Sequence, residues 1–186
     1  LMDAFILLKQ NPAFSNARLR LTGGMTADDK RFIRKQMQKL KKHGFHHDVE
    51  FVEDFRKSAL EKFFNGLTLL SVPVLKGEAF GLYQLESMAS GIPVVQPSLG
   101  AFPEVVKVSG GGWIYEPNTP EALAVKLVEA LSDREKLMTF SQNGRKAVEE
   151  KFHFNILTKK VVAIYQDISL KNKEISGGEK PAAVAV

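Results

Sequence analysis

The chain of 186 residues contains no cysteine, which excludes disulfide bonds, thiolate metal ligands and a cysteine nucleophile. It also lacks a long apolar run, because the longest one, residues 67–75, is interrupted by a serine and a proline. That run is far shorter than the ~20 residues that a helix needs to cross a bilayer. No segment recurs at a fixed period, which excludes a solenoid. The absence of cysteine permits a reducing compartment, and we expect a cytoplasmic protein.

The basic residues are concentrated in one segment. The net charge is +5, and residues 30–42 contain seven basic side chains and no acidic one, which leaves the rest of the chain slightly acidic. Ile33, Met37 and Leu40 recur there at the spacing of one helix face, and we expect Phe32 to extend this apolar stripe. We favour a solvated helix surface over a site for nucleic acid, an anionic membrane or a protein partner, because no aromatic residues are interleaved with the charges.

Short apolar runs alternate with longer amphipathic segments, the pattern of an α/β fold with a parallel sheet and helices on both faces. We predict strands at residues 17–22, 48–52, 67–74, 92–96 and 112–116. We predict helices at residues 1–10, 27–43, 58–65, 82–90, 102–106, 119–131, 133–151 and 155–171. Residues 172–186 have no pattern and are expected to form a disordered tail, so the predicted domain covers residues 1–171.

The first predicted helix, residues 1–10, has no strand ahead of it, although in a parallel sheet a strand precedes each crossover helix. We therefore expect a Rossmann-like domain that lacks its first strand. In the doubly wound order 3-2-1-4-5-6 this strand is central. We expect another chain or a further segment to supply the strand, or a neighbouring element to fill its place.

Chemistry is expected beyond the carboxyl ends of the strands, where the strand-to-helix loops converge. The loop at residues 76–81 combines a lysine, a carboxylate and two glycines at a helix start, where free backbone N–H groups favour an anion such as phosphate. Glu78 and Glu86 could act as general acid and base in hydrolysis, or could accept hydrogen bonds from a nucleotide sugar. Gly23-Gly24 after an earlier strand fits a tight turn or a close approach to a ligand equally well.

Other polar groups carry less weight. Gly100 and Glu104 follow the next strand, where a carboxylate is favourable in the first turn of a helix whatever its function. His43, His46 and His47 have a spacing that could suit a metal, but they fall at a helix end, where a solvated histidine is commoner. We therefore expect no metal site.

Residues 77–95 read Gly-Glu-Ala-Phe-Gly-Leu-Tyr-Gln-Leu-Glu-Ser-Met-Ala-Ser-Gly-Ile-Pro-Val-Val. This stretch resembles the signature of the family 4 glycosyltransferases, glycogen-synthase-like enzymes of the GT-B fold. They carry two glutamates separated by seven residues and then an Ala-x-Gly-x-Pro-Val-Val strand. The resemblance covers about residues 1–168 and corresponds to the C-terminal, donor-binding half of such an enzyme.

The resemblance implies transfer of a sugar from a nucleoside diphosphate sugar, with retention at the anomeric carbon and without a metal or other cofactor. It implies that Glu78 contacts hydroxyls of the transferred sugar and is required for catalysis, and that Glu86 accepts hydrogen bonds from the ribose. The loop at residues 52–55 would lie near the base. Lys76 matches no family position and is included as a candidate for the diphosphate. The full set of expected donor-binding residues is Gly23, Gly24, Lys76, Ala79, Phe80, Gly81, Leu82 and Glu86.

Two departures from the family follow from the same resemblance. The arginine and lysine that grip the diphosphate in family members have no matching position here, and the N-terminal acceptor domain is absent, so we expect this chain alone to be inactive. The expected partners are a nucleotide sugar and the acceptor domain, or another chain that supplies the first strand. Peripheral membrane association of the full enzyme is compatible with the family, and nucleic acid is not expected.

Two alternatives remain. A GT-B sugar-nucleotide epimerase would lack the Ala-Phe-Gly-Leu run that follows Glu78 here. A non-catalytic nucleotide-binding or interaction module would use the basic segment at residues 30–42.

Overall fold

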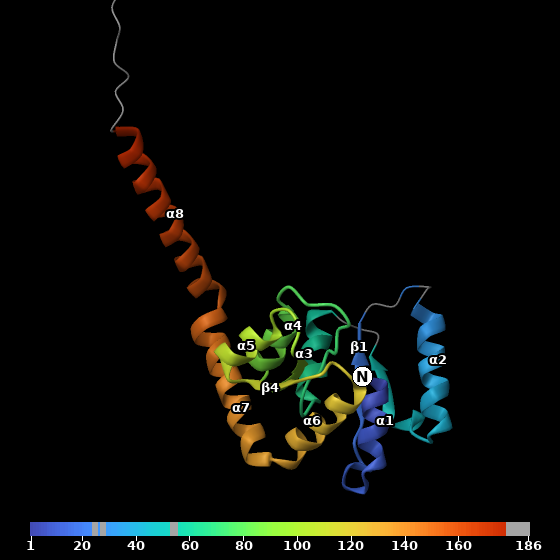
Figure 1. Ribbon diagram of the computed structural model, residues 1–186. Helices are drawn as coiled ribbons and strands as arrows, with labels where there is room; N and C mark the ends of the chain where they lie inside the picture. Colours follow the sequence, from blue (N-terminus) through green and yellow to red (C-terminus); the bar gives the residue numbers. More distant parts are fainter. Residues whose placement is uncertain (24–25, 27–28, 53–55, 178–186) are drawn as a thin grey trace, which may run out of the picture. The chain divides into compact units, whose positions relative to one another are not determined.

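The computed structural model describes residues 1–23, 26, 29–52 and 56–177 (Figure 1). The chain divides after Val148 into two compact units, which are described separately. Helices of the first unit are α1 (Met2–Gln10), α2 (Asp29–Lys42), α3 (Lys57–Asn65), α4 (Leu82–Ala89), α5 (Phe102–Ser109), α6 (Pro120–Ser132) and α7 (Arg134–Ala147). Its strands are β1 (Leu19–Thr22), β2 (Val49–Val52), β3 (Val94–Pro97) and β4 (Gly112–Tyr115). Short 3-10 turns occupy Pro12–Phe14 and His46–Asp48.

The strands form two parallel pairs, which confirms the α/β class. β1 lies beside β2, with Leu19 opposite Val49, and β3 lies beside β4, with Val94 opposite Gly112. Among the described residues no strand joins the two pairs, so the parallel sheet, whose central first strand we expected to be missing, is divided in two.

The strand predicted at residues 67–74 is reduced to one bridge, between Leu70 and Val94. The Leu70 N–H donates to the carbonyl of Pro93 at 3.0 Å, and the Val95 N–H donates to the Leu70 carbonyl at 2.8 Å. The next parallel bridge would require an N–H from Pro97, and proline has none. The ladder therefore stops after one step. The strand that the apolar pattern predicted at residues 67–74 does not form for this reason.

The core of the first unit lies between the β3–β4 pair and the helices α1 and α6. All four residues of β3 are buried, as expected for a strand that is covered on both faces. α1 packs against α6 because both helices have an apolar face directed at the same cluster. The main buried side chains of this cluster are Ala4, Phe5, Leu8, Val95, Trp113, Tyr115, Leu123 and Leu127.

Three details differ from the predicted elements. α5 extends to Ser109 rather than to residue 106, and it stops at Gly110, whose φ of 60° lies in the left-handed region. Phe32 does not extend the apolar stripe of α2 but is 62% exposed. The α-helix predicted at residues 133–151 ends earlier, because α7 stops at Ala147 and a π-helical turn, Val148–Phe152, follows it.

The second unit contains one long helix, α8 (Phe154–Gly177). It continues six residues beyond the predicted end at residue 171, so residues 172–177 of the expected tail are helical, while residues 178–186 lie outside the described part of the chain. The helix exposes many apolar side chains, among them Phe154, Tyr165 and Leu170. No helix among the described residues is long and apolar enough to cross a membrane.

Candidate functional site

Two loops that follow neighbouring strand segments meet at Glu78. The N–H of Ala101, in the loop after β3, donates to the backbone carbonyl of Glu78 at 3.0 Å. Gly100 has a φ of 53°, and a Cβ on it would lie 2.6 Å from the backbone nitrogen of Glu78 and would overlap its carbonyl oxygen. Only glycine allows this approach. The convergence of these loops is the arrangement that the sequence predicted for the candidate site.

The Glu78 side chain is half-buried, and both of its carboxylate oxygens have a donor. Oε1 accepts a hydrogen bond from the Ala79 N–H at 3.0 Å, and Oε2 accepts one from the Tyr83 hydroxyl at 3.4 Å. Each oxygen keeps capacity for a further donor, because a carboxylate has about four lone-pair sites. Glu78 is therefore a fixed acceptor rather than a freely rotating side chain.

Tyr83 was not identified from the sequence, although its place in the first turn of the helix after Glu78 was a usable signal. Burial, and the neighbouring Glu78 carboxylate, raise the pKa of the Tyr83 phenol to about 12. The phenol is therefore a protonated donor near neutral pH, and it orients the carboxylate beside it. Its ring lies 6.4 Å from that of Phe102, which begins α5.

The N-terminus of α4 lies directly beside Glu78. The helix begins after Gly81, whose φ is 73°, and a Cβ at this glycine would lie 3.2 Å from Cγ of Glu78 and 3.1 Å from Cζ of Tyr83. No side chain caps this end of α4. The first N–H groups of the helix have no intrahelical acceptor, so they and the helix dipole form an electropositive end that suits an anion.

Two buried glutamines hold the loop in place. The Gln84 side chain is completely buried, and its Nε2 donates to the carbonyl of Phe80 at 2.5 Å. Gln96, also completely buried, accepts the Val72 N–H through Oε1 at 3.0 Å, so this N–H has a side-chain acceptor where a continued ladder would offer it a strand carbonyl. The loop with Glu78 is thus anchored by side chains on α4 and β3.

The other predicted donor-binding residues are solvent-facing. Lys76, Ala79, Phe80 and Leu82 are exposed around the start of α4. Glu86 lies on the exposed face of the same helix, one turn after Leu82, and within the described residues its side chain has no hydrogen bond or ion pair.

The glycine-rich loop after β1 is only partly described. Gly23 is exposed with a φ of 147°, whereas Gly24 lies outside the described residues. The expected base-binding loop is likewise outside them, apart from residue 52. Across the described residues there is no group of three or more histidine, aspartate or glutamate side chains that could hold a metal ion.

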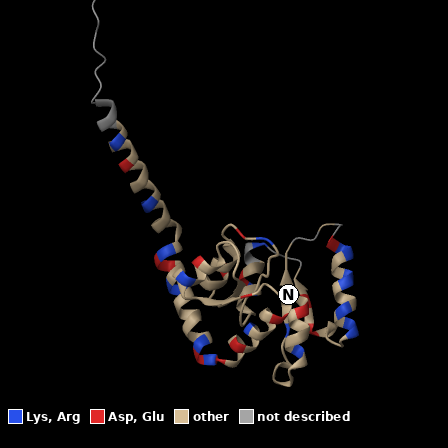
Figure 2. Ribbon diagram, in the orientation of Figure 1, with Lys and Arg blue, Asp and Glu red and all other residues tan. Residues whose placement is uncertain are grey.

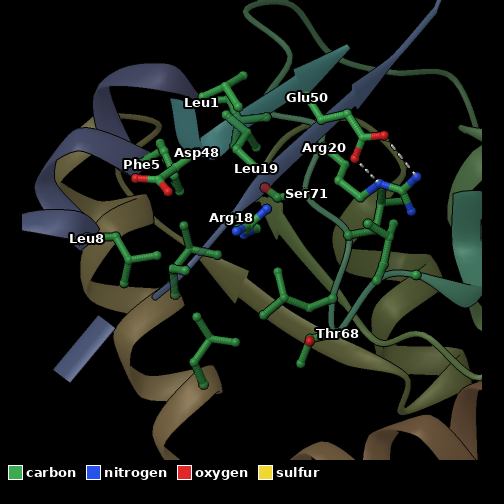
Figure 3. Close-up of a pocket in the computed structure, with 18 of the residues that line it drawn as sticks. Leu1, Phe5, Leu8, Arg18, Leu19, Arg20, Asp48, Glu50, Thr68 and Ser71 are labelled. Carbon is green, nitrogen blue, oxygen red and sulfur yellow. Dashed lines mark hydrogen bonds and ion pairs between the residues drawn. The ribbon is translucent and has the colours of Figure 1, made fainter. Parts of the chain in front are cut away.

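A cavity lies away from Glu78, between β1 and residues 66–71 (Figure 3). It has a volume of about 400 Å³, and its lining includes Phe5 and Leu8 of α1 and Leu127 and Leu131 of α6. At its edge Arg20 binds Glu50 across the β1–β2 pair, with 2.8 Å between Nε and Oε2, and donates to the carbonyl of Phe63 at 3.4 Å. The cavity therefore separates the two strand pairs and contains none of the predicted site residues.

Similarity to known proteins agrees with this geometry. The model of the family described as "Glycosyl transferases group 1" matches residues 1–147. An uncharacterized glycosyltransferase of Methanocaldococcus jannaschii is 32% identical over 124 residues, which cover 66% of this chain and 31% of that protein. The N-acetyl-alpha-D-glucosaminyl L-malate synthase of Bacillus anthracis is 29% identical over 96 residues, which cover 52% of this chain and 25% of that protein. The chain thus spans about a third or less of the length of these relatives.

Solved structures show the same architecture. The C-terminal domain of a group 1 glycosyl transferase, LpcC, from Francisella tularensis superposes with a TM-score of 0.73 at 26% identity, over 82% of this chain and 77% of that one. Anabaena HepE, solved with UDP and glucose, superposes with a TM-score of 0.75 at 20% identity, over 88% of this chain and 44% of that one. The fold is that of a C-terminal domain of GT-B glycosyltransferases, and the chain belongs to the group 1 glycosyl transferase family.

Proposed function

We propose that this chain is the donor-binding domain of a retaining glycosyltransferase, which transfers a sugar from a nucleoside diphosphate sugar to an acceptor. The single observation that carries the proposal is the placement of a fixed carboxylate acceptor, Glu78, beside the uncapped N-terminus of α4. A sugar needs acceptors for its hydroxyls, and a diphosphate needs N–H donors and positive potential. One short loop supplies both.

In this proposal the transferred sugar lies against Glu78, and the backbone N–H groups of Phe80, Gly81 and Leu82 face the sugar and the diphosphate. As the bond to the leaving diphosphate breaks, these N–H groups stabilise its growing negative charge without a metal ion. Lys76 adds positive charge, and the two glycines at positions 23 and 24 are assigned to the diphosphate, where a residue without a side chain allows close approach of the backbone. Glu86 accepts hydrogen bonds from the ribose. HepE, with the same fold, is solved with UDP and glucose, which supports a nucleotide sugar as ligand.

We also propose that a further parallel strand fills the cavity between β1 and residues 66–71. A strand that leads into α1 by the usual right-handed crossover would lie beside β1, on the side where the cavity is. It would join the two strand pairs into one sheet. The strand and the acceptor domain would come from further polypeptide or from another chain. A version of the protein that includes such a strand is expected to have a higher Tm, and an unchanged Tm would contradict the assignment.

Isothermal titration with UDP, GDP and ADP and with their sugar derivatives tests the donor assignment. We expect one nucleoside diphosphate to bind, and Glu86→Ala to weaken it. Glu104→Ala is the matched control, because Glu104 is likewise an exposed glutamate on a short helix beside the site, in the first turn of α5. Absence of nucleotide binding in the full-length enzyme would refute the proposed function. Equal affinities for Glu86→Ala and the unmodified chain would refute the ribose assignment alone.

A further inference from the structure

The helix α2 presents a basic face that the proposed transfer reaction does not use. Figure 2 shows basic residues along the whole length of this helix. Leu40 is completely buried and Met37 packs against the core, so the apolar stripe of the helix is already covered by its own domain. Arg31, Arg34 and Lys35 are exposed on the outer side. Within the described residues, none of these three has an acidic partner.

Phe32 lies in the middle of these charges rather than under the helix. It is 62% exposed, and it lines a shallow surface hollow together with Arg31, Arg34, Lys35 and Gln38. By contrast Lys39, nearer the C-terminal end of α2, is bound to Asp3 of α1 at 2.5 Å, so part of the helix is fixed to the domain by an ion pair. The free cations and the exposed aromatic ring therefore belong to one outward face.

We propose that this face of α2 binds an anionic lipid bilayer. The helix is straight and roughly 20 Å long, at about 1.5 Å per residue, so its cations lie in a row that a planar anionic surface can meet at once. An exposed phenyl ring between cations can enter the headgroup region while the charges remain at the phosphates. Nucleic acid fits less well, because one aromatic residue does not form the series of stacking positions that a single strand uses.

This proposal is independent of the proposed function, since it depends on no residue of the Glu78 loop. Its test is sedimentation of the chain with vesicles of phosphatidylcholine alone, and with vesicles of phosphatidylcholine and phosphatidylglycerol in equal amounts. Each cation at an anionic surface strengthens binding roughly fivefold, so Arg34→Glu with Lys35→Glu is expected to weaken binding to the anionic vesicles at least about tenfold. Phe32→Ala is expected to weaken it several-fold.

The matched control is Lys159→Glu with Lys160→Glu, which reverses two adjacent exposed lysines on α8. This double substitution causes the same change in net charge. It also tests whether α8, which exposes apolar side chains, is the helix that contacts the vesicles. We expect binding within about twofold of the unmodified chain. Thermal unfolding of each variant establishes that the fold is retained.

Three results would overturn the proposal. The first is equal sedimentation with neutral and anionic vesicles, or none with either. The second is an equal loss in the α8 control. The third is tight capture on heparin or single-stranded DNA with weak binding to anionic vesicles, which would assign α2 to a polyanionic partner instead.

Discussion

The hydrogen bond between Tyr83 and Glu78 gives the sharpest prediction for the proposed donor site. Tyr83→Phe removes the hydroxyl that donates to Oε2 of Glu78 and leaves the ring, its packing near Phe102 and the Ala79 N–H bond in place. One carboxylate oxygen then loses its fixed donor. Glu78 is then held by the Ala79 N–H alone and turns away from the sugar more readily, while the N–H groups that would hold the diphosphate do not change.

The size of the effect follows from the geometry. A hydrogen bond to a charged acceptor contributes about 1.5–3 kcal/mol at ordinary distances. The Tyr83–Glu78 bond is 3.4 Å long, beyond the usual range for an O–H donor, and the carboxylate is only half-buried. We therefore expect a loss of about 1 kcal/mol, which corresponds to roughly fivefold weaker binding.

The assay compares the affinity for a nucleoside diphosphate with that for its sugar derivative, both measured by isothermal titration. Tyr83→Phe should weaken the sugar derivative about fivefold and leave the diphosphate unchanged. Tyr165→Phe, at an exposed tyrosine of α8, should change neither affinity. An equal loss for both ligands would indicate a general disturbance of the loop, and no loss for either would refute a positioning role for Tyr83.

A second readout does not depend on any ligand. The carboxylate of Glu78 contributes to the raised pKa of Tyr83, which is about 12. Glu78→Gln removes that negative charge, so the pKa of the Tyr83 phenol should fall toward its ordinary value of about 10. Tyrosine absorbance followed through an alkaline titration measures this change, and an unchanged titration curve would show that the two groups do not interact.

Three further predictions concern stability. Gly100→Ala should displace Glu78 and lower the free energy of unfolding by more than about 1 kcal/mol, measured by urea unfolding. The reason is that a Cβ at this position overlaps the Glu78 backbone and that the residue has a positive φ. An unchanged free energy of unfolding would contradict the close approach of Gly100 to Glu78. The phenols of Tyr83 and Tyr115 both have a pKa raised to about 12. Their contribution to the free energy of unfolding is therefore complete below pH 10 and is lost as the pH rises toward about 12. If the two phenols had their ordinary pKa, the free energy of unfolding measured across this range would show no decline from them. Leu123→Ala should lower the free energy of unfolding by about 2–5 kcal/mol, measured by the same urea assay, because this side chain is 1% exposed within the core. A decrease below about 1 kcal/mol would mean that the surrounding core closes the space left by the leucine side chain.

Much of the fold was predictable because its signals are local. The alternation of apolar runs and amphipathic segments predicted the four strands that form and the eight α-helices within a few residues, apart from the C-terminal ends of α7 and α8. The strand predicted at residues 67–74 was wrong, because its pairing depends on Pro97 in the neighbouring strand, and proline has no N–H to donate. The apolar pattern of a segment carries no information about a hydrogen-bond donor that is missing from its partner strand.

The candidate site was predictable to a similar degree. The glycines and Glu78 stood out because a loop between strand and helix favours these residue types, and the structure brings Gly100 to Glu78 as the converging loops require. Tyr83 and Gln84 were missed because their roles arise from tertiary contacts with the loop. The exposure of Phe32 was likewise misjudged, since its neighbour Ile33 is half-buried on the apolar stripe and we assigned both residues to one side of the helix.

The single bridge between Leu70 and Val94 has a consequence for how the proposed donor site opens. Beyond that bridge, the chain as far as Gly81 is attached to the domain by separate hydrogen bonds with Gln96, Asn118, Ala101 and Gln84 rather than by a continuous ladder. Segments held in this way exchange their amide hydrogens through local openings that cost less free energy than global unfolding. The Glu78 loop can therefore detach and re-form over an intact β3, so a ligand could enter and leave without disturbing the core.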